Sequence, residues 1–158
     1  PTDSNNLLKL NNLANRIRLS ERAKDSIRQM DDMEIGEIYH LIDDGFLTNL
    51  GVLWIGTPKQ RAYICYPLTV QYIVYDNLEH KVRKEDWHDH TLAPDELLLD
   101  IEKQAVELTY SYEFPNGLFR KQIHHYNPTL IRELLVNAVA HRSYTISKDI
   151  MIEVYPSR

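Results

Sequence analysis

The sequence predicts an α+β fold in which a small mixed sheet is packed with helices. Two segments, 68–75 and 148–155, are rich in β-branched and aromatic residues, which favours strands. Two others, 94–110 and 128–141, place apolar residues at helical spacing. Of the 158 residues, 43% are hydrophobic and 26% are charged, so the chain can bury a core of globular size.

The composition narrows the class of protein. A net charge of −5 leaves no overall basic field to attract nucleic acid, although a local basic patch is compatible with it. No apolar run approaches the roughly 20 residues that span a bilayer, and residues 1–10 lack a signal-peptide pattern. The single cysteine, Cys65, excludes an intramolecular disulfide and fits a reducing compartment. We therefore expect a cytoplasmic protein without membrane contact.

The N-terminal part is predicted to begin with a connector and to become helical from Ser20 onward. Residues 1–17 are rich in Asn with few bulky residues besides Leu, which indicates a connector or arm. Ser20 offers an N-cap for a first helix. A second helix over 33–42 aligns one apolar stripe, and Gly45 is suited to follow its end. The stripe consists of Ile35, Ile38, Tyr39 and Ile42.

The middle of the chain is predicted to supply strands. The segment 46–56 indicates a turn at Thr48–Asn49 and a buried strand over 52–55, and Pro58 then marks a loop. The strand over 68–75 is followed by a polar link. Tyrosines in or beside these strands could stack on single-stranded nucleic acid, but half-buried strand positions explain them more simply. They are Tyr63, Tyr66, Tyr72 and Tyr75.

The remaining elements carry stronger local signals. Pro94 is placed to begin a helix, and Asn116–Gly117 marks the turn of a hairpin. Asn127 caps a helix that begins at Pro128 and continues to about His141, and a strand over 148–155 follows. We expect the apolar side of that helix to pack against the sheet. This side consists of Leu134, Leu135, Ala138 and Val139.

Polar residues recur along the same helix. Glu133, Asn137 and His141 stand four residues apart, so they share one face. An exposed, solvated face is the simpler interpretation, because such polar pairs are common on helix surfaces. Alternatively, a carboxylate can deprotonate a water and an amide oxygen one turn later can hold Mg²⁺, as phosphoryl transfer requires. The spacing puts the two groups roughly 6 Å apart along the axis.

Other polar clusters are weaker candidates for a functional site. His88, Asp89 and His90 lie in WHDHT, where an exposed loop is the simpler interpretation than a metal site. Basic residues near Lys59 and Arg61 could contact phosphate, with a solvated face as the alternative. The chain contains no GxxxxGK[ST] loop, so helicase activity is not predicted.

Three segments resemble one family. IRELLVNAVAHRSY, residues 131–144, resembles the REAxxNAxxHRxY signature of RecG-related transcriptional regulators, which opens a divergent GHKL (histidine-kinase-like) ATPase module. DDGFLTNLGVLWIGTPKQR, residues 43–61, resembles the LTNAGxLLFGxxPQR segment of the Schlafen-like AlbA-type DNA-binding domain that precedes this module. IMIEVYPSR, residues 150–158, resembles the strand after the signature. The resemblance covers roughly 38–158.

The resemblance implies a division and a set of roles. Residues 1–92 would hold the C-terminal part of the AlbA-type domain with a helical connector, and 93–158 the N-terminal part of the GHKL-like module, truncated at the start of its α/β sandwich. Glu133 would be the catalytic residue that orients the attacking water, and Asn137 would bind Mg²⁺ through the nucleotide. His141 and Arg142 would lie near the phosphates. Ser143 departs from the usual Asp after the HR pair.

Two functions follow as expectations. The first is a fragment of a nucleic-acid-linked regulatory protein, which couples a DNA-binding domain to a nucleotide-binding module and acts in transcriptional regulation. The second is a structural or oligomerisation module with vestigial ATPase residues. We expect ATP and Mg²⁺ as cofactors of the full-length parent and none in this chain, DNA as a partner of the parent, and a homo-oligomer. Because this family branch has a degenerate glycine box, the resemblance does not imply ATP hydrolysis.

Overall fold

The computed structural model describes residues 1–116 and 119–156, and it has the predicted α+β fold. The chain forms two compact units, Pro1–Tyr66 with His90–Ala93 and Pro67–Asp89 with Pro94–Arg158. The division therefore differs from the boundary expected after residue 92. The reason is that the strands between 70 and 87 belong to the sheet that also holds the last strand.

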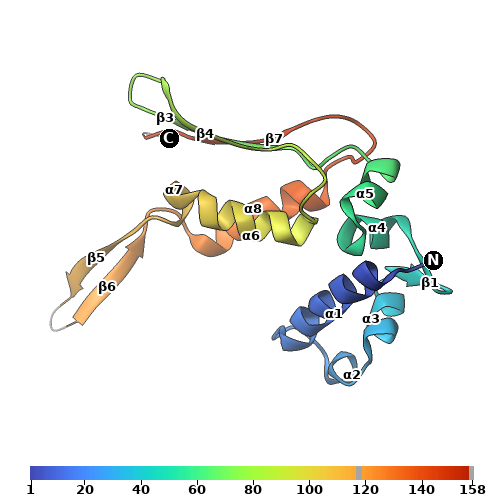
Figure 1. The fold of residues 1–158 in the computed structure, drawn as a ribbon. Coiled ribbons are helices and arrows are strands. Elements are labelled where there is room, and N and C mark those ends of the chain that lie inside the picture. Colours follow the sequence, from blue (N-terminus) through green and yellow to red (C-terminus); the bar gives the residue numbers. More distant parts are fainter. Residues whose placement is uncertain (117–118, 157–158) are drawn as a thin grey trace. The chain divides into compact units, whose positions relative to one another are not determined.

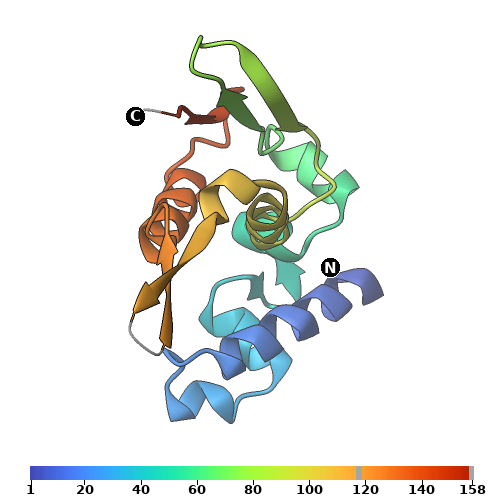
Figure 2. The same cartoon turned by 90° about the vertical axis from the view of Figure 1, so that its left-hand side faces the viewer.

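The first unit consists mainly of short helices that begin at capping residues (Figures 1 and 2). Asp3, Asp31 and Thr57 each start a helix with a capping box, in which two first-turn backbone N–H groups are satisfied reciprocally. In this unit α1 packs against α3. The elements are α1 (Ser4–Leu19), α2 (Asp25–Arg28), α3 (Asp32–Ile38), β1 (Ile42–Asp43), β2 (Phe46–Leu47), α4 (Asn49–Ile55) and α5 (Pro58–Ile64).

Two predictions for the N-terminal region were wrong. Residues 1–17 form most of α1 and not a connector, because Asp3 caps the helix and Leu10 and Ala14 bury one of its sides. Ser20 ends α1 instead of beginning the next helix, and its backbone N–H closes the last turn. The side that α1 buries is narrow, which is why the sequence of residues 1–17 shows only a weak apolar pattern.

The helix expected over 33–42 is shorter than predicted, and its last apolar residue belongs to a strand. α3 ends at Ile38, and the chain then passes through His40, whose φ is 55°. Ile42 lies in β1, which pairs with β2 across the turn Asp44–Gly45. Both turn residues have positive φ, 46° and 76°, as tight hairpin turns require. Gly45 therefore serves a hairpin and not a helix end.

The strand predicted over 52–55 is a helix. Thr48 is the N-cap of α4, and its hydroxyl accepts the Gly51 N–H at 2.9 Å. An apolar run of this length does not distinguish a strand from a buried helix by periodicity, so the cap is the stronger signal. The predicted loop at Pro58 is also helical, because Pro58 occupies the first position of α5 behind the Thr57 cap.

A buried amide links α1 to the end of α4. The side chain of Asn6, fully buried, donates from Nδ2 to the Ile55 carbonyl at 3.1 Å and to Gln60 Oε1 at 2.9 Å. The Ile55 carbonyl belongs to the last turn of α4, where no partner within the helix is available. The apolar cluster of this unit consists of Leu10, Leu41, Ile42 and Ile55.

Arg61 attaches the segment 90–93 to the first unit. Its side chain is 2% exposed and donates to the carbonyls of Gly56 at 2.6 Å, His90 at 2.7 Å and Thr91 at 3.1 Å. A buried guanidinium must find acceptors for its N–H groups, and here backbone carbonyls supply them. Arg61 is therefore a structural residue and not a surface contact for phosphate.

The second unit contains a three-stranded sheet with helices along one face (Figure 1). The strand order is β4-β3-β7, and the central strand β3 pairs antiparallel with β4 and parallel with β7. The predicted strands over 68–75 and 148–155 are thus present and adjacent, and the polar link between 77 and 92 holds an additional strand. The elements are β3 (Val70–Tyr75), β4 (Lys81–Trp87), α6 (Pro94–Gln104), α7 (Val106–Thr109), β5 (Ser111–Asn116), β6 (Phe119–His124), α8 (Pro128–Ala140) and β7 (Ile150–Val154).

α8 packs mainly against α6 and α7. Val139 is buried and both Leu135 and Ala138 are half-buried, whereas Leu134 is 56% exposed. The prediction that Leu134 packs against the sheet was therefore wrong. Because the main contacts of α8 are with two other helices, the stripe that it buries is narrower than its apolar composition suggested.

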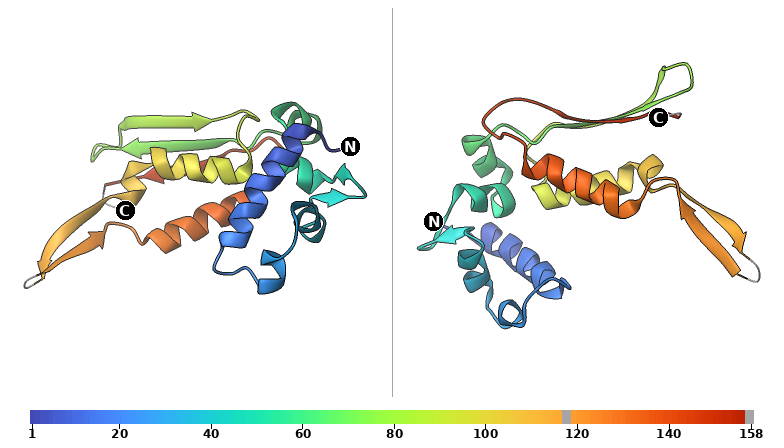
Figure 3. Two further views of the ribbon diagram at one scale, coloured as in Figure 1. Left: turned by 60° about the horizontal axis from the view of Figure 1, so that its bottom comes forward. Right: turned by 180° about the vertical axis from the view of Figure 1, so that it is seen from behind.

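The predicted hairpin is present but does not join the main sheet. β5 and β6 pair only with each other among the described residues, and both views of Figure 3 show them extending away from α7 and α8. The turn predicted at Asn116–Gly117 lies partly outside the described residues. Of the four segments expected in one sheet, only 68–75 and 150–155 share it.

Candidate functional site

The candidate site is a polar stripe along α8. Asn127 begins this helix, because its side chain accepts two first-turn backbone N–H groups at 3.0 and 3.3 Å. Every fourth residue of the helix then shares a face, which places Glu133, Asn137 and His141 in line. The local sequence alone thus accounts for the alignment of the three predicted residues.

The stripe faces solvent. Glu133, Asn137 and His141 are all exposed. In the part of the chain that the structure describes, no hydrogen bond, ion pair or ring contact engages any of the three side chains. The carboxylate of Glu133 can therefore accept a proton from a water, and the amide oxygen of Asn137 can coordinate a hard cation. Their exposure is equally what a solvated helix face requires.

His141 ends the helix as well as the stripe. Its backbone N–H donates to the Asn137 carbonyl at 2.9 Å, and the residue has left the helical conformation with φ −97° and ψ 2°. The imidazole therefore stands at the point where the chain turns from α8 toward β7. Tyr144 stabilises this turn, since its hydroxyl donates to the Val139 carbonyl at 3.0 Å.

The structure places Arg142 in a different environment from the other three predicted residues. Arg142 is half-buried, and its guanidinium donates to the Pro67 carbonyl at 2.8 Å and to the Lys148 carbonyl at 3.1 Å. It also lies over the Tyr144 ring, 5.3 Å from the centroid. The third nitrogen, Nη1, is buried and has no hydrogen-bond partner among the described residues. Arg142 thus ties both ends of the α8–β7 connection to the start of β3.

A second anchor holds the end of that connection. The Asp149 carboxylate accepts hydrogen bonds from Thr69 Oγ1 at 2.6 Å and from Gln71 Nε2 at 2.5 Å. These two bonds, with smaller contributions from the charges of Arg142 and Lys84, lower the pKa of Asp149 below its ordinary value. The predictions did not include Asp149, and its position directly before a strand gave no distinguishing signal.

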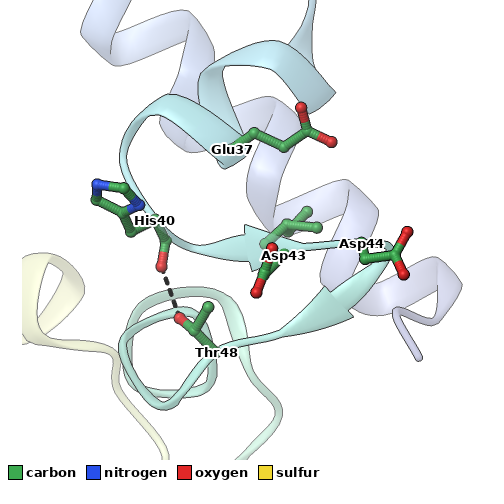
Figure 4. A pocket seen from close by; sticks show the side chains of 6 residues that line it. Glu37, His40, Asp43, Asp44 and Thr48 are labelled. Carbon is green, nitrogen blue, oxygen red and sulfur yellow. Dashed lines mark hydrogen bonds between the residues drawn. The ribbon is translucent and has the colours of Figure 1, made fainter.

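The first unit contains a hollow of about 570 Å³ that was not predicted as a site (Figure 4). Its carboxylates come from the end of α3 and from the β1–β2 hairpin, and Figure 4 shows them pointing in different directions. The Thr48 hydroxyl donates across its edge to the His40 carbonyl at 2.6 Å. The lining residues are Glu37, His40, Ile42, Asp43, Asp44 and Thr48. The adjacent carboxylates of Asp43 and Asp44 were the available signal in the sequence.

No candidate metal centre emerges from residues 1–116 and 119–156. No group of three or more His, Cys, Asp or Glu side chains there is arranged to hold a metal ion. The histidines of WHDHT are divided between the two units, with His88 in the second and His90 in the first. His88 and Asp89 are exposed, which is consistent with the exposed loop that the sequence predicts for this segment.

Comparison with known proteins identifies the fold alone. No protein-family model matches the chain, and no curated protein matches it. Among solved structures, the chain is similar to the DIP2311 protein from Corynebacterium diphtheriae, with a TM-score of 0.65 and 17% sequence identity. The similarity covers 92% of this chain but only 27% of that protein. In the described residues, no helix has the length and apolar character needed to cross a membrane.

Proposed function

We propose that this chain is part of a cytoplasmic, nucleic-acid-linked regulatory protein whose α8 stripe contacts a magnesium-bound nucleotide. Glu133 would orient a water, Asn137 would hold Mg²⁺, and His141 would approach the phosphates. The observation that supports this proposal is that the three side chains are aligned, exposed and unengaged among the described residues. Side chains that stabilised the fold would have partners within it, as Arg142 has.

In this proposal Arg142 acts near the phosphates mainly by holding the turn that carries His141. Its bonds to the Pro67 and Lys148 carbonyls define where α8 ends relative to β3. A nucleotide bound along α8 would then meet a preorganised helix end, which reduces the entropy lost on binding. DNA would be a partner of the full-length protein through the region that resembles the AlbA-type domain.

The 158 residues supply only part of such a nucleotide site. The GHKL-like sites that the signature resembles also use Gly-rich turns around adenine and the phosphates, and no glycine follows Gly117 in this sequence. We therefore expect the 158-residue chain to bind Mg²⁺-ATP weakly or not at all. Binding should appear in a full-length protein that contains such turns, because adenine and lid contacts add their binding energy there.

Titration calorimetry of the full-length protein with Mg²⁺-ATP tests the proposal. Asn137→Ala should weaken binding, whereas Glu133→Ala should leave affinity intact and abolish any slow hydrolysis, since a general base acts on the water. Val136→Ala is the matched control, because Val136 is exposed on the same helix but lies off the stripe. Equal uptake by wild type and Asn137→Ala, or uptake by neither, would exclude a magnesium site on α8.

The alternative is a structural or oligomerisation module in which the stripe is vestigial. It is favoured by the apolar side chains that the second unit leaves exposed on α8, where Leu130 and Leu134 are 54% and 56% exposed. Exposed apolar area of this kind often marks a contact surface. The same titration separates the two functions, because a vestigial stripe predicts no effect of Asn137→Ala at any nucleotide concentration.

A further inference from the structure

The two outer strands of the three-stranded sheet have edges of opposite character. Along β4, KVRKEDW, every residue except Val82 and Trp87 is charged, and its pairing with β3 shifts register between Val74 and Tyr75. Charges and irregular pairing are the means by which natural edge strands avoid further pairing. β7 has the sequence IMIEV, carries a single charge at Glu153, and pairs with β3 in an unbroken register. The β7 edge therefore lacks the protection that the β4 edge has.

The backbone direction of β7 identifies which groups face the open edge. The Ile150 N–H donates to the Thr69 carbonyl at 2.9 Å, so the backbone groups of Ile150 point toward β3. Because these directions alternate along a strand, the N–H and C=O groups of Met151 and Glu153 point away from β3. Among the described residues, no strand pairs with this side of β7.

The faces of β7 are also defined by its partner. Ile152 is the Cα partner of Tyr72, and Tyr72 contacts α7 through its hydroxyl, so Ile152 lies on the helix-covered face. Met151 and Glu153 then lie on the opposite, outer face, where Met151 is 57% exposed. Substitutions at Met151 therefore change the edge and the outer face without disturbing the packing of the helices.

We propose that the β7 edge binds the β7 edge of a second copy of this chain, in an antiparallel pair centred on Ile152. In this register Met151 of each copy lies opposite Glu153 of the other, so the outward backbone groups of both residues meet and bond. Ile152 faces its own counterpart at the two-fold axis, where the side chains of a non-hydrogen-bonded pair come closest. The two sheets become one continuous sheet, and the charged β4 strands form its outer edges.

Repulsion between like charges disfavours the two registers next to the one centred on Ile152. A pair centred on Met151 would place Glu153 opposite Asp149, and a pair centred on Glu153 would place that carboxylate opposite its own copy. Like charges directly opposite each other destabilise a strand pair. An equivalent pairing of β4 strands centred on Lys84 would set two lysines face to face. The carboxylate of Glu153 is also held within its own copy, because it accepts a 3.0 Å hydrogen bond from the Tyr75 hydroxyl.

This inference is independent of the proposed nucleotide site, since it involves neither α8 nor its polar stripe. Sedimentation equilibrium of the 158-residue chain over a wide concentration range should show a monomer–dimer equilibrium. Met151→Glu should raise the dissociation constant and Met151→Lys should lower it, because residue 151 faces Glu153 of the other copy. The pair of residue 151 with Glu153 of the other copy occurs twice in the dimer. We therefore expect the dissociation constant to change roughly two- to thirty-fold, upward for Met151→Glu and downward for Met151→Lys. Val82→Glu and Val82→Lys, on the exposed opposite edge, are the matched controls and should have no effect.

A disulfide test checks the register directly. In a Cys65→Ser background, Ile152→Cys should form a covalent dimer on oxidation, because the Cα atoms of such a pair lie about 4.5 Å apart, within disulfide range. Met151→Cys should not form one, because it faces Glu153 and lies only diagonal to its own counterpart. A chain that stays monomeric at high concentration would overturn the proposal. So would equal shifts of the dissociation constant by Met151→Glu and Met151→Lys, or equal cross-linking at positions 151 and 152.

Discussion

The Tyr72 hydroxyl donates a 2.6 Å hydrogen bond to Oε2 of Glu107, and this bond joins the central strand β3 to α7. Arg83, on the neighbouring strand β4, reaches the same carboxylate at 3.2 Å. Burial and the bond to Glu107 raise the pKa of Tyr72 well above its ordinary value, so the hydroxyl keeps its proton. A fully buried hydroxyl and a charged acceptor thus connect the sheet to the helices that cover it.

Tyr72→Phe should destabilise the second unit by about 1–3 kcal/mol, because a buried hydrogen bond to a charged acceptor is lost. Urea unfolding measures the change in the free energy of unfolding, and hydrogen exchange of the β3 and α7 amides shows whether the loss is local to these two elements. Tyr75→Phe is the control, since it removes a bond to the exposed carboxylate of Glu153 and should cost much less. Equal losses in the two variants would mean that the Tyr72–Glu107 bond does not hold the helices to the sheet.

The second unit should lose stability in acid through Glu107. Burial opposes ionisation of this carboxyl, but the hydrogen bond from Tyr72 and the charge of Arg83 outweigh it and lower the pKa below 4.5. A folded-state pKa below the unfolded one stabilises the fold above that unfolded pKa and loses the contribution as the pH falls through the folded value. Glu107→Gln should therefore flatten the stability profile below pH 4.5, by a modest amount because the side chain is 31% exposed. A profile as steep as that of the wild type would assign the acid sensitivity to other groups.

Arg142→Met should loosen the connection between α8 and β7. The substitution leaves the carbonyls of Pro67 and Lys148 without their donor, which we expect to cost about 1–3 kcal/mol. Hydrogen exchange should accelerate in residues 143–150 even without nucleotide, and Arg142→Lys should restore part of the protection. Arg132→Met, at an exposed site on α8, is the control and should stay within about 0.5 kcal/mol of wild type. If hydrogen exchange of residues 143–150 were unchanged in Arg142→Met, Arg142 would not be the residue that holds the α8–β7 connection in place.

Gly51→Ala should destabilise the first unit much more than Gly36→Ala. A Cβ at Gly51 would lie 1.8 Å from the carbonyl oxygen of Leu41, a backbone atom directly before β1 that no side-chain rotation can move. A Cβ at Gly36 would lie 3.1 Å from Ile42 Cδ1, which a side-chain rotation relieves. We expect about 1–3 kcal/mol or more for Gly51→Ala, and a nearly neutral result for Gly36→Ala, where helix propensity gains up to about 1 kcal/mol. Thermal unfolding followed by circular dichroism compares them, and similar midpoints would contradict the close approach of α4 to Leu41.

Prediction from the sequence succeeded where local chemistry is decisive. Asn127 followed by Pro128 marks a helix start by capping and by the fixed φ of proline, and α8 begins there. Pro94 marks the start of α6 in the same way. Prediction failed in the first unit, where the run 52–55 is too short to show a period and the Thr48 cap was interpreted as a turn. It also missed β4, because an edge strand made mostly of charged residues resembles a loop.

The sequence by itself determined that Glu133, Asn137 and His141 lie in line, because a helix aligns every fourth residue whatever surrounds it. Only the tertiary structure decided that these side chains face solvent while Arg142 binds the carbonyls of Pro67 and Lys148. Only the tertiary structure, likewise, placed β7 beside β3, with no strand of the described residues pairing with the other edge of β7. The physical reason is range: capping and helical period act between neighbours in the chain, whereas strand pairing and burial depend on contacts between distant segments that no local pattern encodes.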